Sequence, residues 1–341
     1  MIGQDNTLAK PSAEPAAALA IWLKLLSAGP IAILLALIVV LSIAAPNFLT
    51  PRNISNILAQ TAVIAVVAMG QHLVILTRGI DLSVGSNLAL ATVLGALTWH
   101  TTGSDILTVL AMLASGAGVG AINGMFYTFG RLPHPFIITL ATLSIAKGTA
   151  LQLADGRAIP GMPDAIKFLG GGSVLGVPAS FFVVLGVAGL ILLMARRMVW
   201  GRWIYAVGGK PEAALRMGIP VRGVLISTYV MAGLCAGVGA VLLAGRTDAG
   251  SPLFGNLLEL DTIAAVIIGG ASFLGGRGHI GHALVGAVMI GVIRNALNLL
   301  NVDIFFQLIA IGVVIVLAVE ADVLRTYLEG RVRTLRAARL Q

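Results

Sequence analysis

The sequence predicts an all-α polytopic membrane protein with about ten transmembrane helices. Of its 341 residues, 58% are hydrophobic and 11% are charged, whereas a soluble domain has about 45–50% apolar and about 25% charged residues. Apolar runs recur along the chain, and each approaches the roughly 20 residues needed to cross a hydrocarbon core about 30 Å thick. Basic residues gather between alternate runs, which is typical of cytoplasmic loops. We therefore expect both termini to lie in the cytoplasm.

The first half of the chain contains the first five predicted helices. Residues 1–27 are predicted to be a cytoplasmic N-terminal segment, because they carry Asp5 and Glu14 and no small-residue cleavage site follows the first apolar run. The first helix ends where Pro46 disfavours a helical conformation at the preceding residue. These helices are expected at residues 28–45, 54–77, 84–99, 106–129 and 136–153.

Residues 154–175 separate the two halves. They contain charged residues, prolines and the run Gly170-Gly171-Gly172, and are predicted to form a loop that is too polar to span the membrane. The later helices are expected at residues 178–195, 223–244, 261–275, 280–300 and 303–319. The transmembrane domain then covers residues 28–319, and residues 320–341 form a basic cytoplasmic tail.

The basic residues support this topology. About ten crossings place Arg196–Arg222 and the tail on one side, while the outer loops hold Arg52, Arg157, Lys167 and Arg246. A net charge of +8 is also compatible with nucleic-acid binding, but arginines beside a membrane are attracted to anionic lipid by about 1 kcal/mol each. We expect contact with membrane lipid, no nucleic-acid partner, and a multi-pass location in the bacterial inner membrane.

An ionisable residue stands at the edge of the third predicted helix. In GIDLSVGS, residues 79–86, either Asp81 or Ser83 can cap that helix. A charged residue at membrane depth costs roughly 2.5–3.5 kcal/mol on insertion scales. Asp81 is therefore expected to face a water-filled cavity or the membrane interface, and helix capping is the alternative explanation.

Six segments, in this order along the chain, carry a family resemblance. They are GIDLSVGS, Ala121-Ile122-Asn123-Gly124, PFIITLATLSIAKG, GRWIYAVGGKPEAALRMGI, SPLFGNLLELDTIAAVIIGGASFLGG and RNALNLLNVDIFFQ. Together they resemble the ribose-type ABC transporter permeases of bacterial inner membranes, which belong to a superfamily of branched-chain amino acid and sugar permeases.

The resemblance implies that residues 199–222 form the cytoplasmic loop that docks on a separate ATPase subunit. Within this loop Pro211–Met217 is expected to form a short helix. Pro211 suits the first helical turn, Glu212 complements the positive helix end, and Gly218 can end the turn. The alternative is an interfacial loop without a partner. The residues assigned to ATPase coupling are Gly208, Gly209, Lys210, Pro211, Glu212, Ala213, Ala214, Arg216 and Gly218.

Amides and hydroxyls within the membrane are the candidate substrate contacts, because a sugar presents hydroxyl groups and no charge. Each such side chain can instead form an interhelical hydrogen bond, worth about 0.6 kcal/mol on average. The residues assigned to the substrate pathway are Gln71, Asp81, Ser83, Asn123, Thr139, Asn295, Asn298 and Gln307.

A loose internal repeat is also present. Asp81 opens the third predicted helix and Asn123 follows in the fourth, while Asp261 opens the eighth and Asn295 follows in the ninth. The two units would have opposite orientations. This arrangement is found in inverted-repeat transporters, whose substrate sites lie at the interface between the repeats.

The sequence therefore predicts the permease subunit of a bacterial ABC importer for a monosaccharide such as ribose. It is not expected to be an enzyme, because it shows neither a catalytic HExxH pattern nor a phosphate-binding GxxxxGK[ST] motif. We predict no catalytic residue, metal site or cofactor in this chain, with ATP and Mg²⁺ bound by a partner ATPase subunit. The other expected partners are a second permease copy and a periplasmic sugar-binding protein.

Two kinds of alternative stay open. Related permeases of this architecture carry nucleosides, branched-chain amino acids or a furanose signal, so these solutes compete with a sugar. An ion-coupled secondary transporter is the alternative from a different class, and it would need acids buried within its helices. Most acids here are expected in loops or at helix ends, namely Asp155, Asp164, Glu212, Asp248, Glu259 and Asp261.

Overall fold

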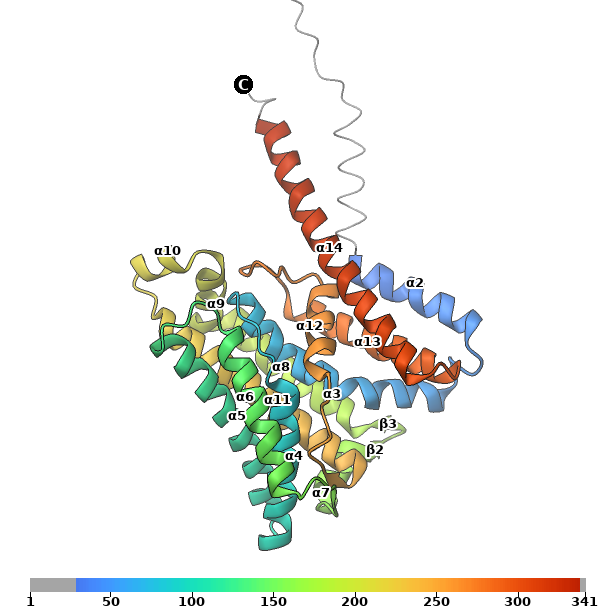
Figure 1. Cartoon of the computed structure of the whole chain (residues 1–341). Coiled ribbons are helices and arrows are strands. Elements are labelled where there is room, and N and C mark those ends of the chain that lie inside the picture. The colour runs from blue at the N-terminus through green and yellow to red at the C-terminus, as the bar shows by residue number, and fades with distance from the viewer. Residues whose placement is uncertain (1–28, 338–341) are drawn as a thin grey trace, which may run out of the picture.

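The protein is a bundle of helices with two short β-ladders. The computed structural model describes residues 29–337 (Figure 1). The predicted N-terminal segment 1–27 and residues 338–341 of the predicted tail lie outside the described residues. In chain order the first helices are α2 (Gly29–Ala44), α3 (Pro51–Leu76), α4 (Val84–Thr102), α5 (Asp105–Phe129) and α6 (Phe136–Leu153).

The later part of the chain begins with short elements. Strand β1 (Ile159–Pro160) and helix α7 (Asp164–Gly171) precede a hairpin of β2 (Ser173–Val174) and β3 (Val177–Pro178). The remaining elements are α8 (Ala179–Arg197), α9 (Val199–Gly209), α10 (Pro211–Arg216), α11 (Val221–Thr247), β4 (Ala249–Gly250), α12 (Leu258–Ile268), α13 (Ile280–Leu299) and α14 (Ile304–Ala337).

The structure corrects the prediction mainly between the long helices. Residues 154–175 are not all loop, since α7 forms there, and α9 occupies the start of the expected coupling loop. The helix expected at 261–275 ends at Ile268. Beyond it, Gly270, Gly275 and Gly276 adopt positive φ angles of 89°, 79° and 69°, a conformation that glycine reaches without a steric penalty.

Six of the described helices are long and apolar enough to cross a membrane, namely α3, α5, α6, α8, α11 and α13. Helix α2 and the part of α14 from Ile304 to Leu317 are shorter apolar helices. Helix α14 does not end near residue 319 as predicted but continues to Ala337. These helices identify an all-α, multi-pass membrane protein.

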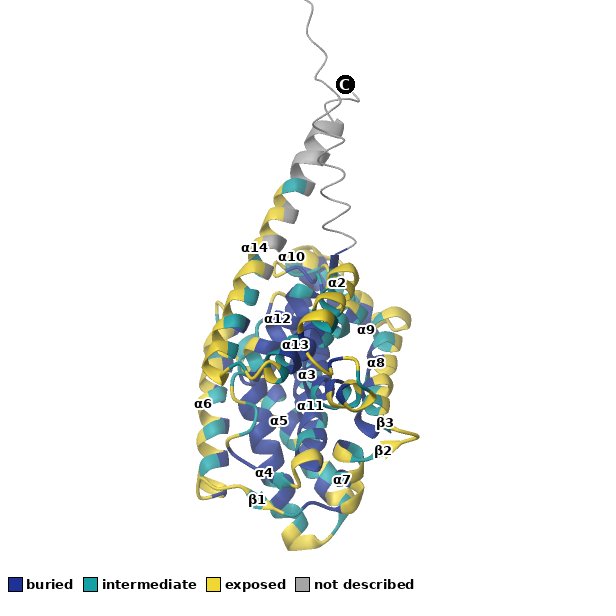
Figure 2. Ribbon diagram, turned by 90° about the vertical axis from the view of Figure 1, so that its right-hand side faces the viewer, coloured by how far each residue is buried: buried dark blue, intermediate teal, exposed yellow. Residues whose placement is uncertain are grey.

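Helices α3 and α11 form the centre of the bundle. Every residue of α3 from Thr61 to Leu76 is buried, and α11 packs against both α3 and α5. A Cβ atom added to Gly116 of α5 would overlap the backbone of Gly233 in α11, so these two glycines allow the helix backbones to meet. Burial is concentrated on the central helices, while α6, α8 and α14 are largely exposed (Figure 2).

The packing repeats within the chain. Helix α5 packs on α11 as α13 packs on α3. Helix α4 contacts α5, α6 and α11, and correspondingly α12 contacts α13, α14 and α3. The same helix–helix contacts are therefore obtained when α3, α4, α5 and α6 are replaced by α11, α12, α13 and α14, respectively.

The two ends of the bundle differ. Helix α10 lies at one end and α7 at the other (Figures 1 and 2). At the α7 end, β1 pairs antiparallel with β4 and so joins the segment after α6 to the segment after α11. The Asp248 carboxylate accepts the Met162 N–H at 2.8 Å, and the Asp248 backbone carbonyl accepts the Gly161 N–H at 2.8 Å. His100 Nε2 lies 2.9 Å from the Pro160 carbonyl oxygen. We call this arrangement the β1–β4 clasp.

Candidate functional site

Helix α4 begins inside the bundle, after an irregular segment that turns back from the end of α3. The Gln71 side-chain amide is oriented so that both its nitrogen and its oxygen are hydrogen-bonded. Its N–H donates to the backbone carbonyl of Asp81 and its oxygen accepts the Asp81 backbone N–H, each at 3.2 Å. Gln71 lies five residues before the end of α3 at Leu76, which is about 8 Å along a helix axis. The chain has therefore returned into the bundle by Asp81, before α4 starts at Val84.

Asp81 organises the turn that precedes α4. Its Oδ1 accepts hydrogen bonds from the Ser83 backbone N–H at 2.9 Å and from the Ser83 hydroxyl at 2.6 Å. Ser83 occupies the N-cap position, but its side chain makes no capping bond to α4. Asp81 thus stabilises the turn, and the direct Ser83 side-chain cap does not form.

Side chains from two further helices complete this site. Asn123 of α5 donates to the Ser83 hydroxyl at 2.9 Å, and the Thr142 hydroxyl of α6 donates to Asn123 Oδ1 at 2.6 Å. Thr139, one turn before Thr142, donates to the Ile80 carbonyl at 3.3 Å. We name the whole group the α4 cluster; it consists of Gln71, Asp81, Ser83, Asn123, Thr139 and Thr142.

The α4 cluster is enclosed by protein. Its six side chains are at most 5% exposed, and they bond one another and nearby backbone groups. In this state the cluster ties α3, α4, α5 and α6 together, which satisfies polar groups that would be costly to leave unpaired. Whether these residues contact the solute stays a prediction.

The other predicted pathway residues lie in two separate pairs. The amides of Asn295 in α13 and Asn53 in α3 exchange two hydrogen bonds of 2.9 Å each. Gln307 at the start of α14 donates to Asn298 Oδ1 at 2.9 Å and to the Val302 carbonyl at 2.9 Å. The structure therefore gathers five of the predicted residues in the α4 cluster and places the other three elsewhere.

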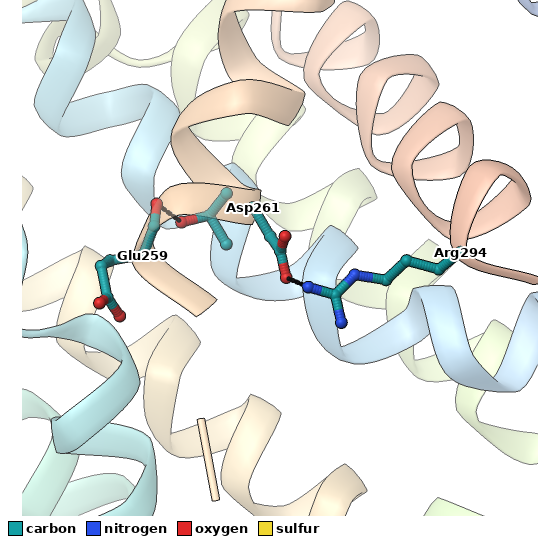
Figure 3. A network of polar contacts seen from close by, with 4 residues as sticks. Glu259, Asp261 and Arg294 are labelled. Carbon is teal, nitrogen blue, oxygen red and sulfur yellow. Dashed lines mark hydrogen bonds and ion pairs between the residues drawn. The ribbon is translucent and has the colours of Figure 1, made fainter. Parts of the chain in front are cut away.

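A second, charged group surrounds the start of α12. Asp261, in the first turn of α12, accepts a hydrogen bond of 2.6 Å from Arg294 Nη2 of α13 (Figure 3). The Asp261 side chain is 4% exposed and that of Arg294 is 34% exposed. Glu259 points away from this ion pair, toward the other side of α12 (Figure 3). Lys147 of α6 donates to the Pro252 carbonyl at 2.6 Å and interacts electrostatically with Glu259.

We name these four residues the α12 cluster; it consists of Glu259, Asp261, Arg294 and Lys147. The segment before α12 touches the start of α4. A Cβ atom added to Gly85 would lie 2.6 Å from Glu259 Oε2 and would overlap the Gly255 carbonyl oxygen. Glu259 thus lies beside the positive end of α4, where a carboxylate is stabilised by the helix dipole. Sequence reasoning correctly placed Glu259 and Asp261 at a helix end, but that end lies within the bundle.

The predicted coupling helix is present as α10. It begins with Pro211, has Glu212 in its first turn and Arg216 in its last turn, and is followed by Gly218 with a φ of 79°. Two apolar side chains here remain exposed, Leu215 at 66% and Met217 at 82%. A short helix that exposes apolar side chains fits a docking element.

Helix α9 connects α10 to the central bundle. Arg78, just after α3, donates to the Gly208 carbonyl at 2.6 Å and also to the Gly209 carbonyl. The Gly276 N–H, in the loop before α13, donates to the Leu76 carbonyl at 2.8 Å. Gly208 and Gly209, both assigned to coupling from the sequence, therefore contact Arg78 just after the end of α3. Arg78 follows Gln71 by seven residues and precedes Asp81 by three, and both of these belong to the α4 cluster.

The same end of the bundle holds a histidine contact. Arg196 bonds the His279 ring, and the Tyr205 hydroxyl donates to the Gly278 carbonyl at 2.9 Å. Burial and the positive charge of Arg196 lower the pKa of His279. A neutral imidazole can accept a hydrogen bond from the arginine, so these contacts join α8 and α9 to the loop before α13.

Comparison with known proteins decides the family. Residues 53–319 match the family model described as "Branched-chain amino acid transport system / permease component". The chain belongs to this family. No solved structure matches it.

Three relatives illustrate the similarity of the permease to named transport proteins. It is 40% identical over 296 residues to the ribose import permease protein RbsC of Bacillus subtilis, covering 86% of this chain and 92% of that protein. It is 38% identical over 293 residues to the D-allose transport system permease protein AlsC of Escherichia coli, with 85% and 89% covered. It is 34% identical over 304 residues to the L-arabinose ABC transporter permease protein AraH of Azospirillum brasilense, with 89% of each covered.

Family membership confirms the resemblance inferred from the sequence and makes the permease a transport component rather than an enzyme. Sequence reasoning missed Thr142, although it lies one helical turn after Thr139. It also missed Arg294, although an arginine inside a 20-residue apolar helix is itself a signal of function. Asn53 was harder to identify from the sequence as an interhelical partner, because it stands near the start of a long helix.

Proposed function

We propose that this permease forms the membrane pathway of a bacterial ABC importer for a monosaccharide. The observation that carries the proposal is extensive similarity to permeases named for ribose, allose and L-arabinose. All three are uncharged sugars, so the shared substrate chemistry is a compact ring bearing several hydroxyls. Ribose is the first solute to test. Nucleosides, branched-chain amino acids and furanose signals are the competing solutes.

The α10 end is the docking site for the ATPase subunit, which binds ATP and Mg²⁺. Basic residues concentrate at this end, including Arg196, Arg197, Arg202 and Arg216. Such enrichment marks the cytoplasmic side of a membrane protein. The permease then crosses the inner membrane ten times, through α2, α3, α4, α5, α6, α8, α11, α12, α13 and α14, and has both termini in the cytoplasm. Helices α4 and α12 complete their crossings together with the irregular segments that precede them. A periplasmic sugar-binding protein delivers solute to the α7 end.

The repeated packing supports an inverted repeat. In this topology α3 runs inward and α11 outward, and likewise α4 runs outward and α12 inward. Helices that begin within the bundle after a broken segment are a recurring element of transporter sites at the interface between inverted repeats. The starts of α4 and α12 meet at Gly85 and Gly255, where this architecture places the solute pathway.

A second permease copy covers the face formed by α6, α12 and α14, which lie on one side of the bundle (Figures 1 and 2). Exposed polar residues on α6, namely Ser144, Thr149 and Gln152, accompany the partly exposed Arg294. By contrast, every exposed residue of α8 before Arg196 is apolar or glycine, which suits contact with lipid. Pairing two copies across the polar face keeps these side chains away from lipid tails and lines a path between them.

Reconstitution tests the proposal. The permease is purified with the ATPase subunit and binding protein encoded by its neighbouring reading frames and placed in vesicles with labelled ribose. ATP-dependent uptake is expected, and competition with unlabelled allose, arabinose, nucleosides and amino acids ranks the solutes. Uptake driven by an ion gradient by the permease alone would instead establish a secondary transporter.

The docking assignment has its own test. Replacing Glu212 with Arg and Ala213 with Trp should separate ATP hydrolysis from uptake, because both positions lie in the first turn of α10. Unchanged transport-coupled ATPase activity would refute the assignment. The orientation is tested by labelling a cysteine at Leu215 from outside intact cells, since the native Cys235 is buried; labelling would contradict a cytoplasmic α10.

A further inference from the structure

The α12 cluster differs from an ordinary structural ion pair in its position. Arg294 lies five residues before the end of α13 at Leu299, or about 8 Å along the helix axis. Its partner Asp261 is almost completely buried. Ionisable residues within membrane-spanning bundles are costly and are found mainly along solute or ion paths. The placement of this pair therefore calls for more than a packing explanation.

The pair also retains hydrogen-bonding capacity. Among the described residues, none bonds Asp261 Oδ1 or Arg294 Nε, although both atoms are buried. The carboxylate has one oxygen committed to Arg294 Nη2 and one oxygen that can accept a further hydrogen bond. An acceptor and an N–H donor side by side match a sugar hydroxyl, which donates and accepts at once.

The charges of the α12 cluster balance. Lys147 and Arg294 carry positive charge, while Glu259 and Asp261 carry negative charge. A balanced group does not select an anion or a cation by net charge, yet it provides strong charge-assisted hydrogen bonds. Arg294 is about one-third exposed, so its guanidinium is accessible, whereas the partly exposed Glu259 lies on the other side of α12 (Figure 3).

We propose that Asp261 and Arg294 form a binding site for a hydroxyl group of an uncharged sugar on the transport pathway. This inference rests on the proposed function, because it assigns the solute contacts of the same pathway. The α4 cluster is then the enclosed counterpart of this site. The solute hydroxyl takes a hydrogen bond from the guanidinium and donates one to the Asp261 carboxylate.

Variants that keep the protein intact test the site in the reconstituted complex. Arg294→Lys retains the positive charge but loses the planar array of N–H donors. We expect a rise in the KM for sugar of about 10- to 100-fold, since a hydrogen bond to a charged group is lost. An unchanged KM in Arg294→Lys would overturn the proposal.

Charge exchange separates binding from structural support. The double variant Asp261→Arg with Arg294→Asp restores an ion pair but reverses the placement of donor and acceptor. Restored assembly with uptake still impaired supports a solute contact, whereas wild-type uptake would show that the pair only supports the fold. The exposed pair Asp164–Lys167, exchanged in the same way, is the matched control.

Asp261→Asn provides a second result if the ion-pair variants fail to assemble, because it keeps a carbonyl acceptor for Arg294 and removes only the negative charge. A KM raised about tenfold is expected on loss of one charge-assisted hydrogen bond, and an unchanged KM would reject the site. The proposed function is judged separately on the wild-type complex. If that complex shows no ATP-dependent sugar uptake, the proposed function is wrong. If the wild-type complex takes up sugar and the variants have the same KM as the wild type, only the proposed site is wrong.

Discussion

The α4 and α12 clusters occupy corresponding places in the repeated packing but differ in how their polar groups are satisfied. In the α4 cluster, Asp81, Ser83 and Asn123 bond one another and are at most 1% exposed. In the α12 cluster, Asp261 and Arg294 pair but keep unbonded atoms, and Arg294 reaches the surface. A repeated architecture can thus use one broken helix to secure the bundle and the other to hold a partly exposed ion pair.

The largest expected effect is on the enclosed cluster. Asp81→Leu should lower the free energy of unfolding by roughly 2–6 kcal/mol, because the buried Ser83 N–H and hydroxyl each lose an acceptor at about 1–3 kcal/mol per group. Thermal unfolding of the permease in detergent measures the change. The control is Asp81→Asn, which keeps a carbonyl acceptor. Equal losses for the two variants would contradict the hydrogen-bonding role of Asp81.

A smaller loss is expected where the two clusters meet. Gly85→Ala places a methyl group against the Gly255 backbone, and overpacking of this kind costs about 1–3 kcal/mol. Both unfolding and sugar uptake should change, since α4 and α12 are forced apart. Gly189→Ala on α8 is the matched control, because no atom lies within 4 Å of the added Cβ. If the control is as damaging as Gly85→Ala, the close contact does not explain the loss.

Arg78 tests whether the α4 cluster is mechanically linked to the α10 end. Arg78→Ala removes the bonds to the Gly208 and Gly209 carbonyls, at a cost of about 1 kcal/mol or less for a partly exposed contact. The binding-protein-stimulated ATPase rate should fall further than the basal rate, because α9 is released from α3. Parallel decreases of both rates would argue against such a link.

The smallest effect is expected at the α7 end. Asp164 and Lys167 form an exposed ion pair of 2.7 Å, and this hydrogen bond lowers the pKa of Asp164. Exposed pairs of this kind contribute little to stability. Lys167→Ala should therefore leave unfolding and uptake unchanged, and a clear loss of uptake would indicate a role for α7 in receiving solute.

The sequence sufficed to predict the long helices, because their apolar length is a direct consequence of crossing a hydrocarbon core. It also predicted α10, through Pro211, Glu212 and Gly218, and grouped Gln71, Asp81, Ser83, Asn123 and Thr139 as polar residues of interest. These predictions depend on composition and local signals. The partners of each side chain depend on how distant helices pack.

Tertiary packing explains what sequence reasoning missed. Asp261 stands near the start of a helix, as predicted, but the segment before α12 turns back into the bundle, so that this helix start is buried. The contact between Gly85 and Gly255, 170 residues apart in the sequence, cannot be read from local pattern. In the loose internal repeat Asn295 follows Asp261 as Asn123 follows Asp81, yet Asn295 bonds Asn53, and it is the neighbouring Arg294 that binds Asp261.

The β1–β4 clasp restricts how the permease can move. Because it fastens the segments that follow α6 and α11, the two halves cannot spread at this end without breaking a backbone ladder. The clasp therefore acts as a brace that keeps the two halves of the chain together at the α7 end of the bundle.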